Sequence, residues 1–173
     1  MLGALTLNVQ PASEISMDKR LFFEHWSDSF RITIATIERF PEADLGRVLV
    51  PGLRPPGELF AHIFAHVNGM LNACVRSELI TDELYRLPAD LDLTRAQPLV
   101  RYARETMEVL LVHGAVNKAA WTQPIRTPSG PVTMQHLCLE SFTHEIHHRG
   151  QLSAMLRLLQ IEPPRVCRHE RTA

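Results

Sequence analysis

Hydrophobic residues recur at steps of three and four positions in four long segments of the chain, the spacing that lines one face of an α-helix. The pattern predicts helices over residues 17–40, 56–79, 94–118 and 133–159. The clearest stripe, in the first of these segments, consists of Phe22, Trp26, Phe30, Ile34, Ile37 and Phe40. Four such helices would bury their apolar faces against one another, so the sequence predicts an all-α fold, a four-helix bundle.

Proline, glycine and short polar residues mark the ends of the predicted helices. Ser16 is the expected N-cap of the first helix, with Asp18 in its first turn, and Pro56 stands at the first position of the second helix. Residues 41–55 and 122–132 are rich in proline and glycine, and we expect them to form connectors.

Two further positions carry expectations about packing. The mixed stretch 80–93 is expected to contain one short helical turn at residues 82–85. Gly150 lies inside the fourth predicted helix, where glycine costs about 1 kcal/mol relative to alanine. We expect another backbone or a ligand to come close to it, because an interior glycine is often tolerated there.

The composition narrows the class of protein. The 173 residues suffice for one domain, which we place at residues 16–165, between an N-terminal extension, residues 1–15, and a polar tail, residues 166–173. The formal net charge of −1 offers no basic excess for binding nucleic acid. No stretch approaches the roughly 20 apolar residues of a membrane helix. The three cysteines form no CxxC motif and the N-terminus lacks the basic segment of a signal peptide, so we expect a cytoplasmic protein.

Histidine is unusually distributed. Five of the nine histidines fall in two groups, one in the second predicted helix and one in the fourth: His62, His66, His144, His147 and His148. His144 and His148 are four residues apart, so their side chains lie on nearly the same helix face and can converge on one ion. Neutral imidazole binds zinc, nickel, copper and iron. A third ligand from a facing helix would complete the site, with His62 the better candidate and His66 its substitute.

Histidines also occur at the edges of apolar faces for purely structural reasons, as half-buried and hydrogen-bonded residues. We give this interpretation to the four isolated histidines, which are His25, His113, His136 and His169. His147 points about 100° away from His148 around the helix axis. We therefore expect His147 either to hold a metal-binding residue in place without binding the metal itself or to lie on the surface.

The segment from His144 to His148, HEIHH, also matches the H-E-x-x-H motif of zinc-dependent hydrolases, in which the glutamate, here Glu145, acts as general base. The motif lies about 25 residues from the end of the chain, which leaves little sequence for a second subdomain. No glycine and third histidine follow it at metzincin spacing. A metal-dependent hydrolase is therefore an alternative and not the leading interpretation.

The run from Thr143 to Leu152, THEIHHRGQL, strongly resembles the last helix of the DinB family, a group of bacterial metalloproteins. The H-x-x-x-H-R-G-Q pattern carries the resemblance. Residues 56–63, PGELFAHI, and the turn at residues 127–130, TPSG, are similar to other parts of the family, and the likeness extends over about residues 17–165. The first helix departs from the family pattern, because Phe23 stands where tyrosine is usual.

The resemblance implies a four-helix bundle with up-down-down-up topology, often assembled as a homodimer. It also implies a divalent metal ion bound by His62, His144 and His148. Zinc or nickel is the expected ion, with manganese or iron as alternatives.

Three neighbours of these histidines are candidates for supporting roles. Glu145 and Gln151 are expected to orient an imidazole ring. Arg149 is expected either to bind a carboxylate of the substrate or to form a salt bridge on the surface.

Characterised relatives of this fold include transferases and isomerases that use a low-molecular-weight thiol. We therefore expect a metal-dependent enzyme that acts on a small molecule, with such a thiol as its second substrate. Two alternatives stay open, a non-enzymatic metal-binding or stress-response dimer and the H-E-x-x-H hydrolase.

Overall fold

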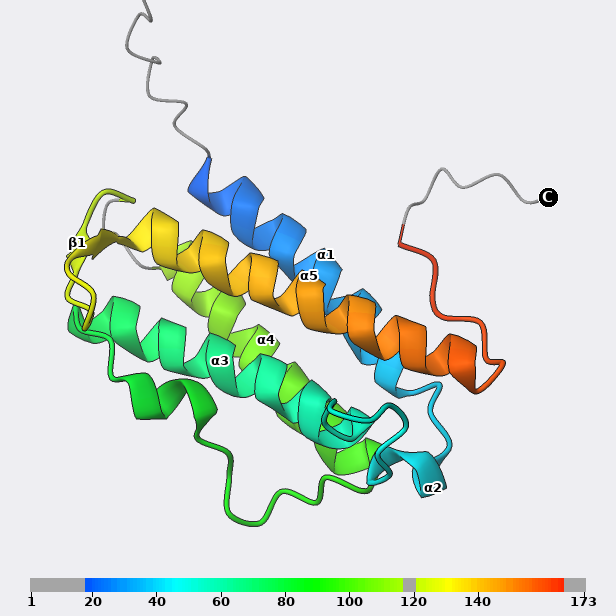
Figure 1. Ribbon diagram of the computed structural model, residues 1–173. Coiled ribbons are helices and arrows are strands. Elements are labelled where there is room, and N and C mark those ends of the chain that lie inside the picture. Colours follow the sequence, from blue (N-terminus) through cyan, green and yellow to red (C-terminus); the bar gives the residue numbers. More distant parts are fainter. Residues whose placement is uncertain (1–17, 117–120, 167–173) are drawn as a thin grey trace, which may run out of the picture.

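The computed structural model of the chain describes residues 18–116 and 121–166. Helices dominate this part of the chain, so the prediction of a mostly helical, all-α protein is confirmed (Figure 1). In chain order the elements are α1 Lys19–Ile37, α2 Glu42–Leu45, α3 Pro56–Arg76, η1 Thr81–Tyr85, α4 Ala96–Val116, β1 Pro124–Ile125, β2 Val132–Thr133 and α5 Met134–Leu158.

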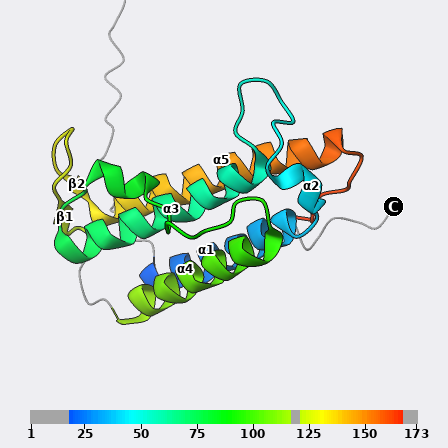
Figure 2. The same ribbon diagram turned by 90° about the horizontal axis from the view of Figure 1, so that it is seen from below.

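The long helices α1, α3, α4 and α5 lie side by side. Helices α1 and α5 run in one direction, and α3 and α4 run in the opposite direction (Figure 1). Figure 2 shows two layers, one made of α3 and α5 and the other of α1 and α4. The closest helix pairs are α3 with α5 and α1 with α4, and α4 also packs on α3. This arrangement brings α3 and α5, the helices that carry the two groups of histidines, into direct contact.

Aromatic side chains fill the core between the layers. Trp26 and Phe30 of α1 are fully buried, and the ring of Phe30 lies 4.9 Å from that of Phe64 on α3. Phe142 of α5 packs edge-on against Trp26, with ring centres 5.8 Å apart. Burying one such ring stabilises the fold by about 1.5–3 kcal/mol, so the stripe on α1 ties the two layers together.

The ends of the helices differ from the sequence-based prediction. Helix α1 begins at Lys19, and the carboxylate of Asp18 accepts the backbone N–H of Leu21 at 2.9 Å. Asp18 is therefore the N-cap, and the prediction of Ser16 in that position is wrong. Helix α3 ends at Arg76 rather than Leu79, because Ser77 adopts a left-handed conformation with φ of 59°.

The connectors contain more structure than the sequence indicated. The segment 41–55 includes the short helix α2, and the segment 122–132 includes β1 and the first residue of β2, which pair antiparallel. The predicted turn at residues 82–85 is present as the 3₁₀-helix η1. Residues 1–15 lie outside the described ranges, as do Lys118 and, apart from Val166, the predicted tail.

No helix in the described ranges combines the length and apolar character needed to cross a lipid bilayer.

Two glycines of α3 allow other backbone segments to touch this helix. A Cβ atom added to Gly57 would lie 1.9 Å from the carbonyl oxygen of Leu93, and one added to Gly69 would lie 2.8 Å from the carbonyl group of Glu83 in η1. Gly150 of α5 differs, because nothing lies within 4 Å of such an atom. The expectation that another backbone segment approaches Gly150 is therefore wrong, and the close approaches of backbone occur on α3 instead.

These glycines provide a matched pair of substitutions. Gly57→Ala should lower the free energy of unfolding by about 1–3 kcal/mol, because the methyl group collides with a backbone carbonyl. Gly150→Ala should raise it by about 0.5–1 kcal/mol, because alanine loses less conformational entropy in an open helical position. Urea denaturation of both variants checks the prediction, and equal effects at the two positions would contradict it.

Candidate metal centre

Three imidazole nitrogens converge between α3 and α5. The Nε2 atom of His144 lies 3.1 Å from Nε2 of His62 on α3 and 3.1 Å from Nε2 of His148, one turn along α5. Bonds of about 2.0–2.1 Å to a tetrahedral zinc ion would hold two nitrogens about 3.3 Å apart. Within the described residues, these three histidines form a group that could hold a metal ion, and their donor atoms fit one.

His66 lies beside this group without joining it. Its Nδ1 atom is 3.1 Å from the hydroxyl oxygen of Ser141, and its ring stacks on His144 with ring centres 4.0 Å apart. His62 thus takes the position facing the α5 pair, and His66 supports the ring of His144. The stacking matters because Nδ1 of His144 is buried and has no hydrogen-bond partner among the described residues.

Gln151 holds the ring of His148. The amide oxygen of Gln151 lies 2.7 Å from Nδ1 of His148, and its amide nitrogen lies 3.3 Å from Nε2 of the exposed His147. The oxygen can only accept, so Nδ1 of His148 carries the proton. Its Nε2 atom therefore presents a lone pair to the other imidazoles, as a metal ligand requires.

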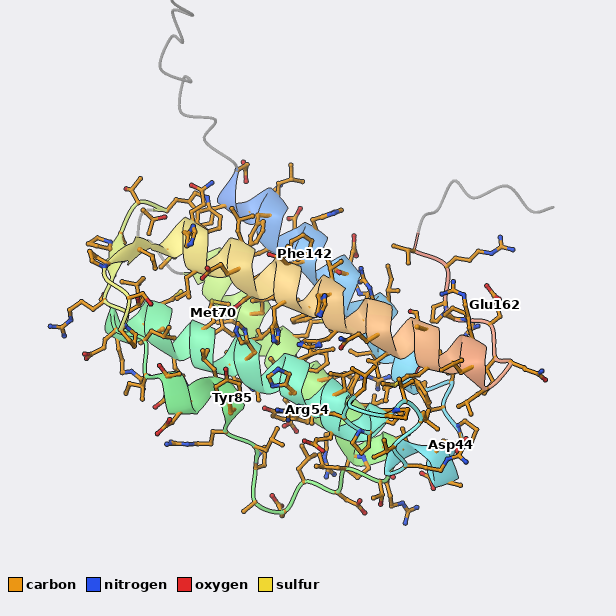
Figure 3. All side chains as sticks on the ribbon, in the orientation of Figure 1. Asp44, Arg54, Met70, Tyr85, Phe142 and Glu162 are labelled. Carbon is orange, nitrogen blue, oxygen red and sulfur yellow. The ribbon has the colours of Figure 1, made fainter. Side chains whose placement is uncertain are left out.

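Tyr85 covers the outer side of His62, a contact that sequence reasoning did not foresee. The two rings stack with centres 5.6 Å apart and planes 4° apart. Tyr85 comes from η1, which approaches α3 at Gly69. Figure 3 shows Tyr85 and Arg54 along the same edge of α3. In the sequence, the only indication of this contact is Gly69 within α3, where another segment of backbone comes close to the helix.

The centre favours uncharged imidazoles. Burial is the main cause, followed by repulsion between the rings, and together they lower the pKa of His62 to about 4 and that of His144 to about 3. Burial also lowers the pKa of His66 to about 4 and lowers that of His148. All four rings are therefore neutral at pH 7, the protonation state that metal binding needs.

Glu145 and Arg149 face away from the histidines, toward α1. Ser29 donates a hydrogen bond to the Glu145 carboxylate at 2.7 Å, and Thr33 donates another. Arg149 donates to the carboxylate at 3.1 Å and to the hydroxyl of Ser29 at 2.6 Å. Burial raises the pKa of Glu145, and Arg149 and the two hydroxyls oppose that shift.

The position of the Glu145–Arg149 ion pair contradicts two expectations from the sequence. Arg149 was expected to bind substrate or to form a surface salt bridge, yet it is 7% exposed and its partner Glu145 is fully buried. Glu145 was expected to orient an imidazole, and its hydrogen bonds instead go to α1 and to Arg149. The same bonds remove Glu145 from the position of a general base, which disfavours the H-E-x-x-H hydrolase.

Two of the four isolated histidines lie on the surface, apart from the centre, and are not half-buried as expected. His25 and His136 are exposed, and His136 is 3.2 Å from Glu140 one turn along α5. The side chains of His113 and His169 lie outside the described part of the chain.

Comparison with known proteins identifies the family of the chain. Residues 13–170 match the DinB family, and the chain belongs to that family. A DinB-like protein from Bacillus subtilis has a similar structure, with a TM-score of 0.67 at 18% identity over 84% of this chain and 96% of that one. A putative DinB family member from Exiguobacterium sibiricum gives a TM-score of 0.67 at 19% identity, covering 87% and 97% of the two chains. A search of curated proteins gave no significant match.

Breaking the buried ion pair should strongly destabilise the protein. Arg149→Met leaves the Glu145 carboxylate buried without its cation, which costs about 3–5 kcal/mol of unfolding free energy. The double variant Glu145→Gln/Arg149→Met should recover part of the loss. Glu140→Gln, at an exposed position of the same helix, is the control and should change stability little. Denaturant titration measures all three, and a loss in Arg149→Met no larger than in the control would refute the buried-pair description.

Acid should destabilise the metal-free protein. The folded-state pKa values of His62, His66 and His144 lie below the ordinary 6.5. Their contribution to stability is therefore present above pH 6.5 and is lost as the pH falls toward 4. The urea midpoint of chelator-treated protein should drop between about pH 7.5 and about pH 5. The drop should be smaller in His144→Gln and unchanged in the exposed control His136→Gln. A drop as large in His144→Gln as in the wild type would contradict the assignment.

Proposed function

We propose that this chain is a metal-dependent enzyme in which His62, His144 and His148 bind one divalent ion. The observation that carries the proposal is the triangle of Nε2 atoms, 3.1 Å apart along two of its sides. Three protein ligands leave a coordination position for an exchangeable molecule, which is typical of catalytic rather than structural sites. Imidazole donors favour zinc or nickel, and manganese or iron are the alternatives.

The proposed substrates are a low-molecular-weight thiol and a small electrophilic molecule. A bound divalent ion would favour the thiolate form of the thiol at neutral pH. The protein residues position the reactants: Gln151 orients His148, and the exposed Tyr85 ring beside His62 offers a surface on which a small molecule can pack. The S–H bond would break with its proton released to solvent, the sulfur would form a bond to the electrophilic carbon, and the leaving group on that carbon would depart with the electron pair of its bond.

The family membership supports two further proposals about the assembly. The helix directions, α1 and α5 against α3 and α4, support the up-down-down-up topology of a four-helix bundle (Figure 1). We also propose a cytoplasmic homodimer, as expected for a DinB-family protein. The alternative role, a non-enzymatic metal-binding or stress-response dimer, uses the same three histidines but no exchangeable substrate.

Metal analysis of purified protein tests the centre itself. We expect about one zinc or nickel ion per chain in the wild type and at least a tenfold loss of affinity in His144→Gln, because a ligand is removed. Gln151→Ala should weaken metal binding about 10- to 100-fold, because it frees the ring of His148. His136→Gln, an exposed histidine on the same helix, should retain the metal. Equal metal content in His144→Gln and the control would overturn the proposed centre.

A thiol titration separates the enzyme from the non-enzymatic alternative. In cobalt-substituted protein, added 2-mercaptoethanol should produce a sulfur-to-cobalt charge-transfer band in the near ultraviolet. The band should be absent in His144→Gln. A cobalt spectrum that does not respond to the thiol would favour the non-enzymatic role, because it would show that no coordination position is open to a thiol.

A further inference from the structure

Three sulfur atoms meet in the core between α3 and α5. The Sγ atom of Cys74 lies 3.6 Å from Sδ of Met70, and Sγ of Cys138 lies 3.8 Å from the same atom. Both thiols donate to the Met70 sulfur, and Cys74 is also a neighbour that raises the pKa of the Cys138 thiol. Met70, Cys74 and Cys138, here called the sulfur cluster, are 0%, 2% and 0% exposed.

The sulfur cluster is separate from the histidine centre. Met70 lies roughly two helical turns after His62 along α3, and Cys138 lies nearly two turns before His144 along α5. The cluster uses the same pair of helices, so the packing that positions the imidazoles also positions the sulfurs. Its donor atoms are different in kind, because thiolate and thioether are soft ligands whereas imidazole is intermediate.

The two sulfur–sulfur distances that involve Met70 suit a single metal ion. With metal–sulfur bonds of about 2.3 Å, as in zinc–thiolate sites, three sulfurs around one ion lie about 4 Å apart. The observed separations of 3.6 and 3.8 Å require shifts of only a few tenths of an ångström. Unbranched methionine and a small thiol can make such shifts by rotamer adjustment.

A positive charge stands near the two thiols. The ammonium group of Lys19, at the start of α1, interacts electrostatically with both Cys74 and Cys138. Two thiolates, one ammonium and one monovalent cation add up to zero net charge, which keeps the cost of burial low. A divalent ion would leave an uncompensated positive charge in the core. Lys19 itself is only partly buried.

We propose that Met70, Cys74 and Cys138 form a second metal site, selective for a soft monovalent ion such as copper(I). Binding breaks the two S–H bonds and releases two protons to solvent. The two thiolates and the Met70 thioether each donate an electron pair to the ion, and neither copper nor sulfur changes oxidation state. The neighbouring Cys74 thiol, followed by burial, raises the pKa of the Cys138 thiol, so Cys138 is protonated in the metal-free cluster and copper(I) binding weakens as the pH falls. The site does not depend on the function proposed for the histidine centre.

The test uses the full chain, first loaded with zinc and then titrated anaerobically with copper(I) held by a competing chromogenic chelator. We expect one copper(I) ion per chain to be withdrawn from the chelator. X-ray absorption at the copper edge should show sulfur neighbours only. Cys138→Ala should lower the copper(I) affinity at least about 100-fold, and Met70→Leu, which preserves volume, about tenfold.

A buried methionine outside the cluster provides the matched control. Met155 of α5 is 1% exposed, so Met155→Leu repeats the chemical change of Met70→Leu and should bind copper(I) as the wild type does. Zinc content and thermal unfolding confirm that each variant is folded. The proposal would be overturned if no copper(I) is withdrawn from the chelator, if nitrogen neighbours surround the bound copper, or if Met70→Leu and Met155→Leu bind copper(I) with equal affinity. A Cys74–Cys138 disulfide that forms in place of copper(I) binding would also overturn it.

Discussion

The packing of α3 against α5 is the constraint on which the chemistry of this protein depends. Imidazole nitrogens are held there 3.1 Å apart, close enough for neutral rings to hydrogen-bond or to share a metal ion. The surrounding aromatic core supplies the free energy that keeps the helices at this distance. Part of that free energy is used to bury polar groups. Burial lowers the pKa values of four histidines and leaves Nδ1 of His144 without a hydrogen bond in the described structure. A metal ion would offset that cost by binding the lone pairs that the fold aims at one point.

Helix α5 contacts two neighbouring helices through two pairs of residues. Each residue of the second pair directly follows a residue of the first pair in the sequence. His144 and His148 face α3, whereas Glu145 and Arg149 face α1. Each pair has i,i+4 spacing, and an offset of one residue turns the second pair by about 100° around the helix. The buried ion pair, with its hydrogen bonds to Ser29, fixes the rotation of α5 about its axis. That rotation decides whether the two histidines point at His62.

This geometry explains why the H-E-x-x-H motif has a different meaning here from that in zinc hydrolases. The motif requires only that two histidines share a face and that a glutamate follows the first of them. In this fold the carboxylate is enclosed by hydroxyl and guanidinium donors on the face of α5 that packs on α1, about 100° around the helix from the imidazoles. A glutamate in that position uses its oxygens to hold α5 against α1.

The sequence by itself determined the long helices, the connectors and the histidines with metal-ligand spacing, because these follow from local periodicity and from distances within one helix. It also contained the DinB-family pattern, which pointed to His62 as the third member of the group. Only the tertiary structure decided that His66 stacks beside the centre, that Arg149 is buried with Glu145, that Tyr85 covers His62 and that three sulfurs meet. Each of these depends on the rotation and spacing of neighbouring helices or on how η1 approaches α3. If a helix is rotated by one residue, different side chains face the neighbouring helix, although the periodicity of hydrophobic residues in the sequence is the same.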